Sequence, residues 1–125
     1  MESSNASRIL SFLLGTALLL AGCCAYDPVL YAQLGKSKTD VMKAFKNAEA
    51  KDVATARDDL NELVGVAQED KKPWCSEPIS QAQDIKAIFD GTDFKRKGSK
   101  IYVHKQENVT EAIDKAIQTQ DRLKK

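Results

Sequence analysis

The sequence predicts an all-α protein: a small four-helix bundle-like domain with an irregular basic insert between its last two helices. The chain has 125 residues, of which 42% are hydrophobic and 30% are charged. This composition allows one small domain and is too apolar for a disordered chain. Apolar residues recur at helical spacing in four stretches, and each stretch has one apolar face only. Such faces are buried when the helices pack against one another as a bundle.

The first predicted helix begins at Ser37, because Ser37-Lys38-Thr39-Asp40 has the pattern of a capping box. Its apolar face carries Val41, Ala44, Phe45 and Ala48. Residues 29–34 follow Asp27-Pro28 and are expected to form a spacer or a first half-helix.

The second predicted helix runs from Asp52 to about Glu69, before Pro73. Its apolar residues fall at offsets 0, 3, 7, 10, 11 and 14, which is a helical stripe. They are Val53, Ala56, Leu60, Leu63, Val64 and Ala67. The acidic residues Asp58, Asp59 and Glu62 are expected on the opposite, polar side.

The third predicted helix begins near Ser76 or Ser80 and ends at Asp90-Gly91, where glycine can adopt a left-handed conformation. Its inward face carries Ala82, Ile85, Ile88 and Phe89. The fourth is expected to begin at a capping Asn108. Its inward face carries Val109, Ala112, Ile113, Ala116 and Ile117. Residues 92–106 form the predicted insert, with 101–103 extended.

The first two dozen residues predict export from the cytoplasm. Arg8 precedes an uncharged run of twelve residues, 9–20, which would span about 18 Å as a helix. That length suits a signal peptide better than a membrane-spanning helix. The run ends in Leu20-Ala21-Gly22-Cys23, which resembles the bacterial lipobox. An ordinary secretory peptide cut near Ala25 is the alternative.

The lipobox resemblance implies that Cys23 is acylated and becomes the first residue of the mature protein. The expected division is then a signal peptide at 1–22, a lipidated spacer at 23–36 and a helical periplasmic domain at 37–125. Cys24 and Ala25 follow Cys23, in place of the aspartate that usually retains lipoproteins in the inner membrane. The resemblance therefore implies an outer-membrane lipoprotein that faces the periplasm, with inner-membrane sorting as the alternative.

Two cysteines, Cys24 and Cys75, remain after lipidation in an oxidising compartment. A bond between them would close a loop of about 50 residues and stabilise the fold by roughly 4 kcal/mol in the chain-entropy model. Alternatively, Cys24 stays free or pairs between molecules. No Cys-x-x-Cys spacing occurs, so zinc binding and redox catalysis are not expected.

Charge is balanced globally, at a formal net +1, so nucleic-acid binding is not expected. It is uneven locally, because five cations lie within residues 95–105. The interpretations are a solvated loop, a contact for anionic lipid headgroups, or a binding surface for an acidic partner. The candidate partner-binding residues are Phe94, Lys95, Arg96, Lys97, Lys100, Tyr102 and His104.

No catalytic motif is found in the sequence, so we expect neither an enzyme nor a metal site. The single histidine, His104, has no candidate catalytic partner at helical spacing. Met42 early and His104 late resemble the b-type cytochromes, which would imply a haem carrier. In that family, however, the histidine lies within the last helix, whereas His104 precedes the expected cap at Asn108.

A second resemblance involves residues 74–83, followed by Ile85-Lys86-Ala87-Ile88-Phe89 and by residues 111–117. These segments resemble the second half of the small helical immunity proteins of type VI secretion amidases and of acid-stress chaperone-like folds. Pro78 is shifted by one position, and the closing cysteine after Ile117 is absent. The resemblance implies a membrane-tethered, non-enzymatic module that binds a protein partner, with homodimerisation open. A stress-response chaperone that opens when acid neutralises its carboxylates is the alternative.

Overall fold

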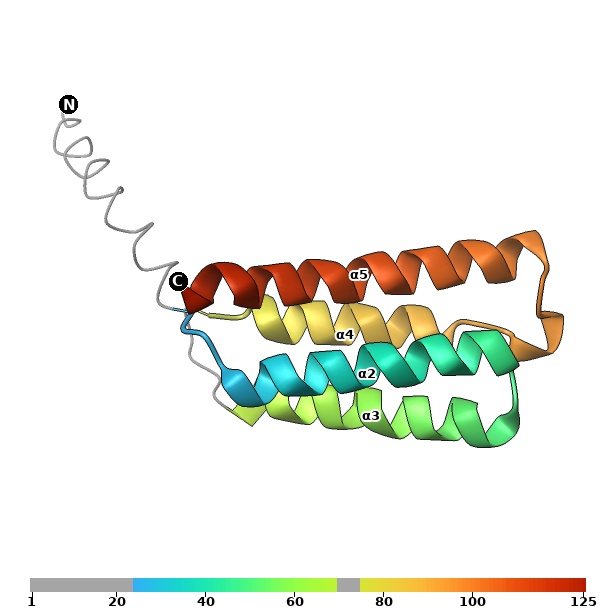
Figure 1. Cartoon of the computed structure of the whole chain (residues 1–125), viewed down its shortest axis with the longest axis horizontal. Coiled ribbons are helices and arrows are strands. Elements are labelled where there is room, and N and C mark those ends of the chain that lie inside the picture. The colour runs from blue at the N-terminus through green and yellow to red at the C-terminus, as the bar shows by residue number, and fades with distance from the viewer. Residues whose placement is uncertain (1–23, 70–74) are drawn as a thin grey trace, which may run out of the picture.

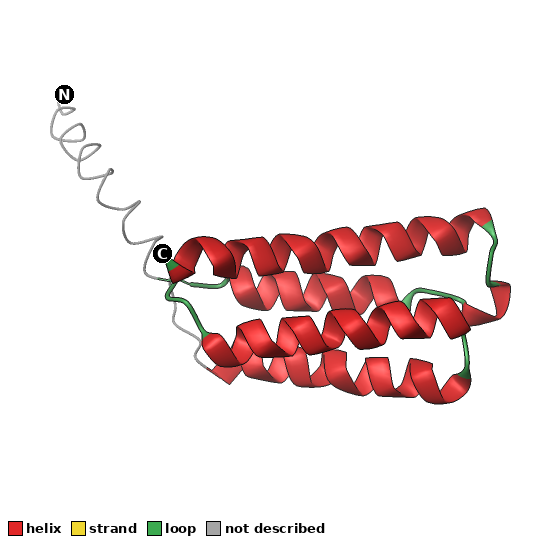
Figure 2. Cartoon of the chain, in the orientation of Figure 1, coloured by secondary structure: helices red, strands yellow, loops and turns green. Residues whose placement is uncertain are grey.

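The computed structural model describes residues 24–69 and 75–125 (Figure 1). Figure 2 shows that the described residues form helices joined by short connections, with no strand among them. The predicted all-α, four-helix fold is thereby confirmed. The helices are α2 (Pro28–Asn47), α3 (Ala50–Glu69), α4 (Glu77–Asp90) and α5 (Lys100–Lys124), and a short 3₁₀ turn covers Phe94–Arg96.

The four helices stand at the corners of a square. Helix α2 packs against α3 and α5, and α4 also packs against α3 and α5, so α2 and α4 are diagonal to each other. Figure 1 shows that the C-terminus and the start of α2 lie at the same end of the bundle, which we call the Cys24 end. The α2–α3 turn and the connection at residues 91–99 lie at the other end, which we call the distal end.

Helix α2 begins nine residues earlier than predicted. The Asp27 carboxylate accepts hydrogen bonds from the backbone N–H groups of Val29 and Leu30, and Pro28 occupies the first turn. Residues 28–36 are therefore the first half of α2 and not a spacer. The prediction that Ser37 caps the helix is wrong, because this residue lies buried in mid-helix.

Helix α5 begins at Lys100 and not at Asn108. The Ser99 hydroxyl caps it by accepting a hydrogen bond from the Tyr102 backbone N–H at 3.2 Å. Residues 101–103 are thus helical, and their predicted extended conformation is wrong. The insert is correspondingly shorter, at residues 91–99. Helix α4 ends at Gly91 as predicted, but Gly91 has φ −84° and is not left-handed.

The predicted apolar faces do form the core. In α3, Leu60 and Leu63 are fully buried, while Val64 is half-buried. Leu30 and Leu34 extend the core along α2 into the segment that was expected to be a spacer or a first half-helix, and the second alternative is the one observed. The other large, buried apolar side chains are Val41, Phe45, Val53, Ile85, Phe89, Tyr102, Val109 and Ile113.

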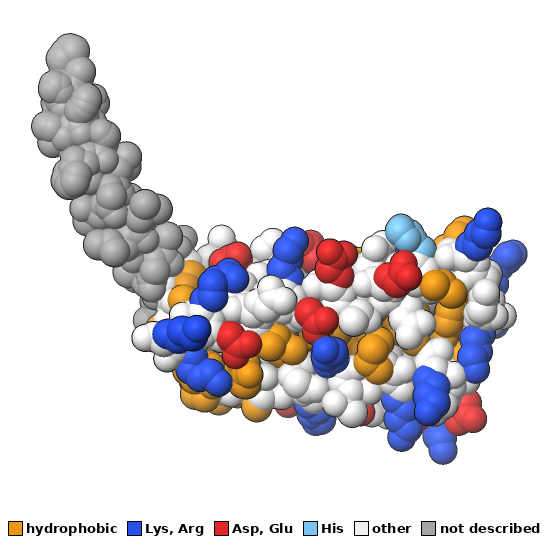
Figure 3. All heavy atoms as spheres, turned by 45° about the horizontal axis from the view of Figure 1, so that its top comes forward, with side chains coloured by type: hydrophobic (Ala, Val, Ile, Leu, Met, Phe, Trp, Pro, Cys, Tyr) orange, Lys and Arg blue, Asp and Glu red, His pale blue; other side chains and the backbone are white. Residues whose placement is uncertain are grey.

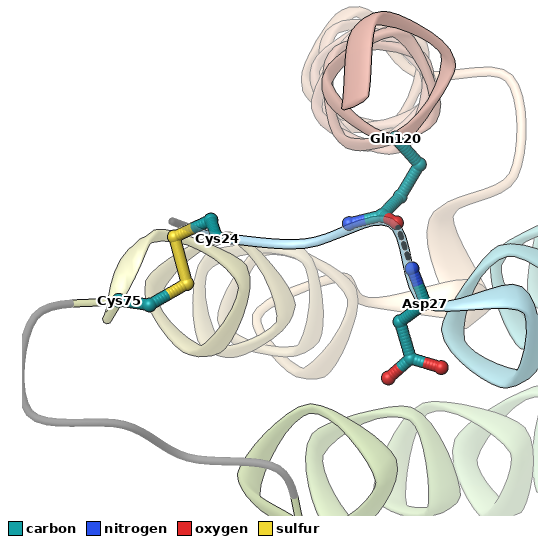
Figure 4. The surroundings of a disulfide bond; sticks show 4 residues. All are labelled: Cys24, Asp27, Cys75 and Gln120. Carbon is teal, nitrogen blue, oxygen red and sulfur yellow. Dashed lines mark hydrogen bonds between the residues drawn. A yellow bond between two sulfur atoms is a disulfide. The ribbon is translucent and has the colours of Figure 1, made fainter. Parts of the chain in front are cut away.

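The Cys24 end is closed by the segment at residues 24–27. Cys24 and Cys75 form the predicted disulfide, with Cα atoms 5.3 Å apart. The Asp27 backbone N–H donates to the side-chain oxygen of Gln120 in α5 at 2.9 Å. Figure 4 shows the segment crossing the end of the bundle from the start of α4 to the start of α2.

Several predictions concern residues outside the described part of the chain, namely the signal segment 1–22, the acylated Cys23 and the stop at Pro73. Among the described residues, no helix is long and apolar enough to cross a membrane.

Truncating Leu60 tests the assignment of the α3 stripe. This side chain is 0% exposed, so Leu60→Ala removes buried methyl groups and leaves a cavity. We expect the free energy of unfolding in urea to fall by about 2–5 kcal/mol. Val103→Ala is the control, because Val103 is 43% exposed and its loss should matter much less. A loss below about 1 kcal/mol for Leu60→Ala would mean that the stripe is misassigned.

Candidate interaction surface

The connection between α4 and α5 is a tightly bonded turn at the distal end. The Asp93 carboxylate accepts a hydrogen bond from the Lys95 backbone N–H at 3.0 Å and so caps the 3₁₀ turn. Gly98, at φ 87°, adopts the left-handed conformation that reverses the chain just before Ser99. These local bonds give the turn a defined shape.

Two residues predicted to contact a partner anchor this turn to the core instead. Phe94 is half-buried, and its ring centroid lies 5.0 Å from that of Phe45 and 5.1 Å from that of Phe89. Tyr102 is only 4% exposed, and its hydroxyl donates a hydrogen bond to the Phe45 carbonyl oxygen. Burial raises the pKa of the Tyr102 phenol. Tyr102 therefore supports the surface from below, and it also lines the hollow beside Arg96 and Lys100.

The predicted cations do lie on the surface. Lys95, Arg96, Lys97 and Lys100 are exposed, and the Arg96 guanidinium lies 3.7 Å from the Asp93 carboxylate. Figure 3 shows several Lys and Arg side chains at the distal end, with Asp and Glu side chains among them, and further cations at the Cys24 end. His104 is also exposed, one turn into α5. The candidate site is thus a cationic turn held in place by aromatic side chains beneath it.

Two exposed aliphatic residues beside the cations were missed by the sequence analysis. Ile101 is 73% exposed and Val103 is 43% exposed, both in the first turn of α5. Ile101, Arg96 and Lys100 also line an open hollow of about 440 Å³. They were missed because residues 101–103 were expected to be extended, and in a helix only Tyr102 of the three turns inward. The distal end therefore combines positive charge with exposed apolar surface.

Charged residues are also divided between two sides of the bundle. Helices α2 and α5 lie side by side and together carry nine Lys or Arg residues against five Asp or Glu residues. Helices α3 and α4 carry three against eight. The two layers are joined by ion pairs such as Lys43–Asp52, at 3.8 Å. The α2/α5 side is consequently positive, and the α3/α4 side is negative.

Asp59 of α3 is buried, contrary to the prediction that it lies on a polar face. It is 5% exposed, and one of its carboxylate oxygens has no hydrogen-bond partner. The Lys36 ammonium lies 3.7 Å from the other oxygen. Burial, followed by the hydrogen bond and negative charge of Asp40, raises the Asp59 pKa from its ordinary 3.8 to about 6. Lys36 lowers this pKa and Glu62 raises it further.

Asp59 is not among the residues that line the hollows of about 750, 510 and 440 Å³ on the described part of the bundle. Within residues 24–69 and 75–125, no group of three or more His, Cys, Asp or Glu side chains could hold a metal ion. Contrary to the sequence expectation, His104 lies within the last helix, α5, but it is not among the residues that line the groove beside Met42. The Met42 sulfur instead lies 3.6 Å from the Thr110 hydroxyl, which donates its proton to the Gln106 carbonyl oxygen at 2.7 Å.

Comparison of the chain with protein-family models, curated proteins and solved structures found no match. The likeness to immunity proteins of type VI secretion amidases therefore stays an expectation from the sequence.

The raised pKa of Asp59 predicts a pH-dependent stability. Because the folded protein binds this proton more tightly than the unfolded chain, Asp59 stabilises the fold below pH 3.8, and that contribution is lost as the pH rises through about 6. We expect Asp59→Asn to be more stable than the wild type by about 1–3 kcal/mol at pH 7 and to flatten this dependence. Urea unfolding at several pH values measures it.

Asp58→Asn is the matched control, because Asp58 is exposed and adjacent in sequence. A pH dependence that survives Asp59→Asn unchanged would contradict the assignment. Protonation of Asp59, taken alone, favours the closed bundle.

Proposed function

We propose that this protein is an outer-membrane lipoprotein, acylated at Cys23, that faces the periplasm and binds a protein partner without catalysing a reaction. The distal end is the proposed binding surface, through Lys95, Arg96, Lys97 and Lys100 together with Ile101. The proposed partner presents an acidic segment that also bears apolar side chains. An inhibitory, immunity or envelope-interaction role would use such a surface.

The placement of the two ends supports this proposal. Cys24 directly follows the residue that would carry the lipid, and it is fixed to the bundle by its disulfide. The 25 residues of α5 span about 37 Å from the distal end to the Cys24 end. A bundle attached at Cys23 can therefore hold its cationic end well away from the membrane surface.

The chemistry of the distal end favours a protein over other anionic partners. Single-stranded nucleic acids are bound by aromatic side chains on which bases stack, and membrane interfaces favour exposed aromatic residues. At the distal end, Phe94 and Tyr102 turn into the core and leave aliphatic Ile101 and Val103 exposed. An exposed aliphatic patch rimmed by cations suits an acidic, partly apolar protein segment.

The single observation that carries the proposal is the exposure of Ile101, at 73%, beside cations whose turn is fixed from below. A solvated loop needs neither a fixed shape nor an exposed isoleucine. A fixed turn loses little conformational entropy when it binds, which favours affinity.

Replacing Cys23 tests the attachment. Acylation requires the Cys23 thiol, so Cys23→Ala is expected to accumulate as an unprocessed precursor that no longer partitions into detergent. Intact mass and detergent partitioning measure both effects in a bacterial host. Cys24→Ala is the control and should still be acylated. Unchanged mass and partitioning of Cys23→Ala would refute lipidation.

Photo-crosslinking tests the binding surface. A benzoylphenylalanine placed at Lys97 should capture a protein through an acidic segment, whereas the same group at Gln83, exposed on α4, should not. Lys95→Glu with Arg96→Glu should reduce the yield about tenfold, because each reversal removes attraction and adds repulsion.

The matched control is Lys115→Glu with Arg122→Glu, which makes the same charge change at exposed positions farther along α5. Equal yields from Lys97 and Gln83, or equal losses in the two charge-reversed variants, would contradict a distal binding surface. Turnover of a substrate by the pure protein would contradict the non-enzymatic role.

A further inference from the structure

We propose that the Cys24–Cys75 disulfide sets the orientation of the bundle on the membrane, by attaching the lipid at the acidic α4 corner and keeping the cationic distal end off the anionic surface. This inference rests on the proposed acylation of Cys23. It concerns how the binding surface is presented, and it makes the disulfide more than a stabilising cross-link.

The corner of attachment follows from the path of the segment at residues 24–27. Cys75 lies two residues before α4, so the disulfide fixes Cys24 beside the start of that helix. Figure 4 shows the chain then crossing the end of the bundle toward α2. Since α2 and α4 are diagonal, a lipid on Cys23 joins the bundle at the corner opposite α2.

A bundle attached at its α4 corner is repelled by an anionic membrane when it tilts toward the membrane surface. A bundle that tilts about this corner would bring the outer face of α4 toward the lipid headgroups. Helix α4 carries Glu77, Asp84 and Asp90 against one cation of its own, Lys86. The Asp90 carboxylate lies 2.6 Å from the Lys86 ammonium and 3.5 Å from the Arg57 guanidinium of α3, so Glu77 and Asp84 supply the uncompensated charge. An anionic surface repels this face, so the upright orientation is favoured.

Without the disulfide, the first fixed point of the chain is Asp27, which caps α2 and is hydrogen-bonded to Gln120. Residues 24–27 then become a free tether that reaches about 13 Å. Tilting about Asp27 lowers α2, a helix that carries four lysines and one aspartate. Three of these lysines also lie near carboxylates of the neighbouring helices, at 2.7–3.8 Å. These lysines and the distal turn would be attracted to the same anionic membrane, so the bundle would lie down.

The experiment measures how close the distal end comes to the lipid headgroups. The full-length acylated protein carries Trp74→Phe and Ile101→Trp, so that its single tryptophan reports from the exposed position 101. It is reconstituted into vesicles that contain a lipid with a spin-labelled headgroup as quencher. One set of vesicles is phosphatidylcholine, and the other contains phosphatidylethanolamine and anionic phosphatidylglycerol.

With the disulfide intact, quenching of the introduced tryptophan should be weak and the same in both sets of vesicles. In a variant with Cys24→Ser and Cys75→Ser, quenching should rise about threefold in the phosphatidylglycerol vesicles only. Salt at ~0.5 M should reverse the rise, because the screening length falls to about 4 Å. Equal quenching with and without the disulfide would overturn the proposal.

A second pair of variants keeps the disulfide. This pair tests the proposed orientation if the serine variant fails to fold, as judged by circular dichroism. Gln83→Lys with Ala87→Lys makes the exposed face of α4 basic and should increase quenching in the anionic vesicles. Ala32→Lys with Thr39→Lys adds the same charge to α2 at exposed positions and should not. An equal effect of the two pairs would overturn the proposal.

Intact mass separates failure of this inference from failure of the proposed function. Bare Cys23 in the native host would refute lipidation and, with it, both proposals. Acylated Cys23 with quenching that ignores the disulfide would refute only the orientation.

Discussion

Each of the four helices has a single apolar face, and the burial of these faces together is the constraint on which the remaining structure depends. The fully buried Leu60, Leu63 and Ile113 come from two helices that are diagonal to each other, so their side chains meet only when the square is complete. Because the faces run along whole helices, the bundle is long and narrow, with two ends of small area. A different segment of the chain closes each end, so the two ends present different surfaces.

The helical fold could be predicted from the sequence because apolar periodicity survives uncertainty about where a helix begins. The α3 stripe was identified nearly in full, since offsets over a 15-residue stretch average out the ambiguity of single positions. Helix starts were harder, because capping residues also occur inside helices. Ser37 and Asn108 fit a capping pattern but lie in mid-helix, whereas Asp27-Pro28 and Ser99 are the true starts.

The candidate site was predicted in part. Cations are exposed nearly everywhere in proteins, so a cluster of them in sequence was enough to place Lys95, Arg96 and Lys97 on the surface. Sequence alone could not show which apolar residues beside the cations are buried and which are exposed, because the direction of a side chain depends on the conformation of its backbone. Once residues 100–103 are helical, Tyr102 turns inward, and Ile101 and Val103 turn outward. Asp59 was misplaced for a related reason: it lies on the edge of the α3 stripe, where α2 covers it.

The two ends are coupled through α5, the longest helix. Near one terminus, Tyr102 reaches Phe45 of α2 and supports the cationic turn. Near the other, Gln120 accepts the hydrogen bond from Asp27, where the crossing segment enters α2. A continuous helix transmits orientation over its length, since its backbone hydrogen bonds leave little freedom between successive turns. Under the proposed acylation of Cys23, the direction in which the distal end faces is set about 37 Å away, by the corner at which the chain enters the bundle.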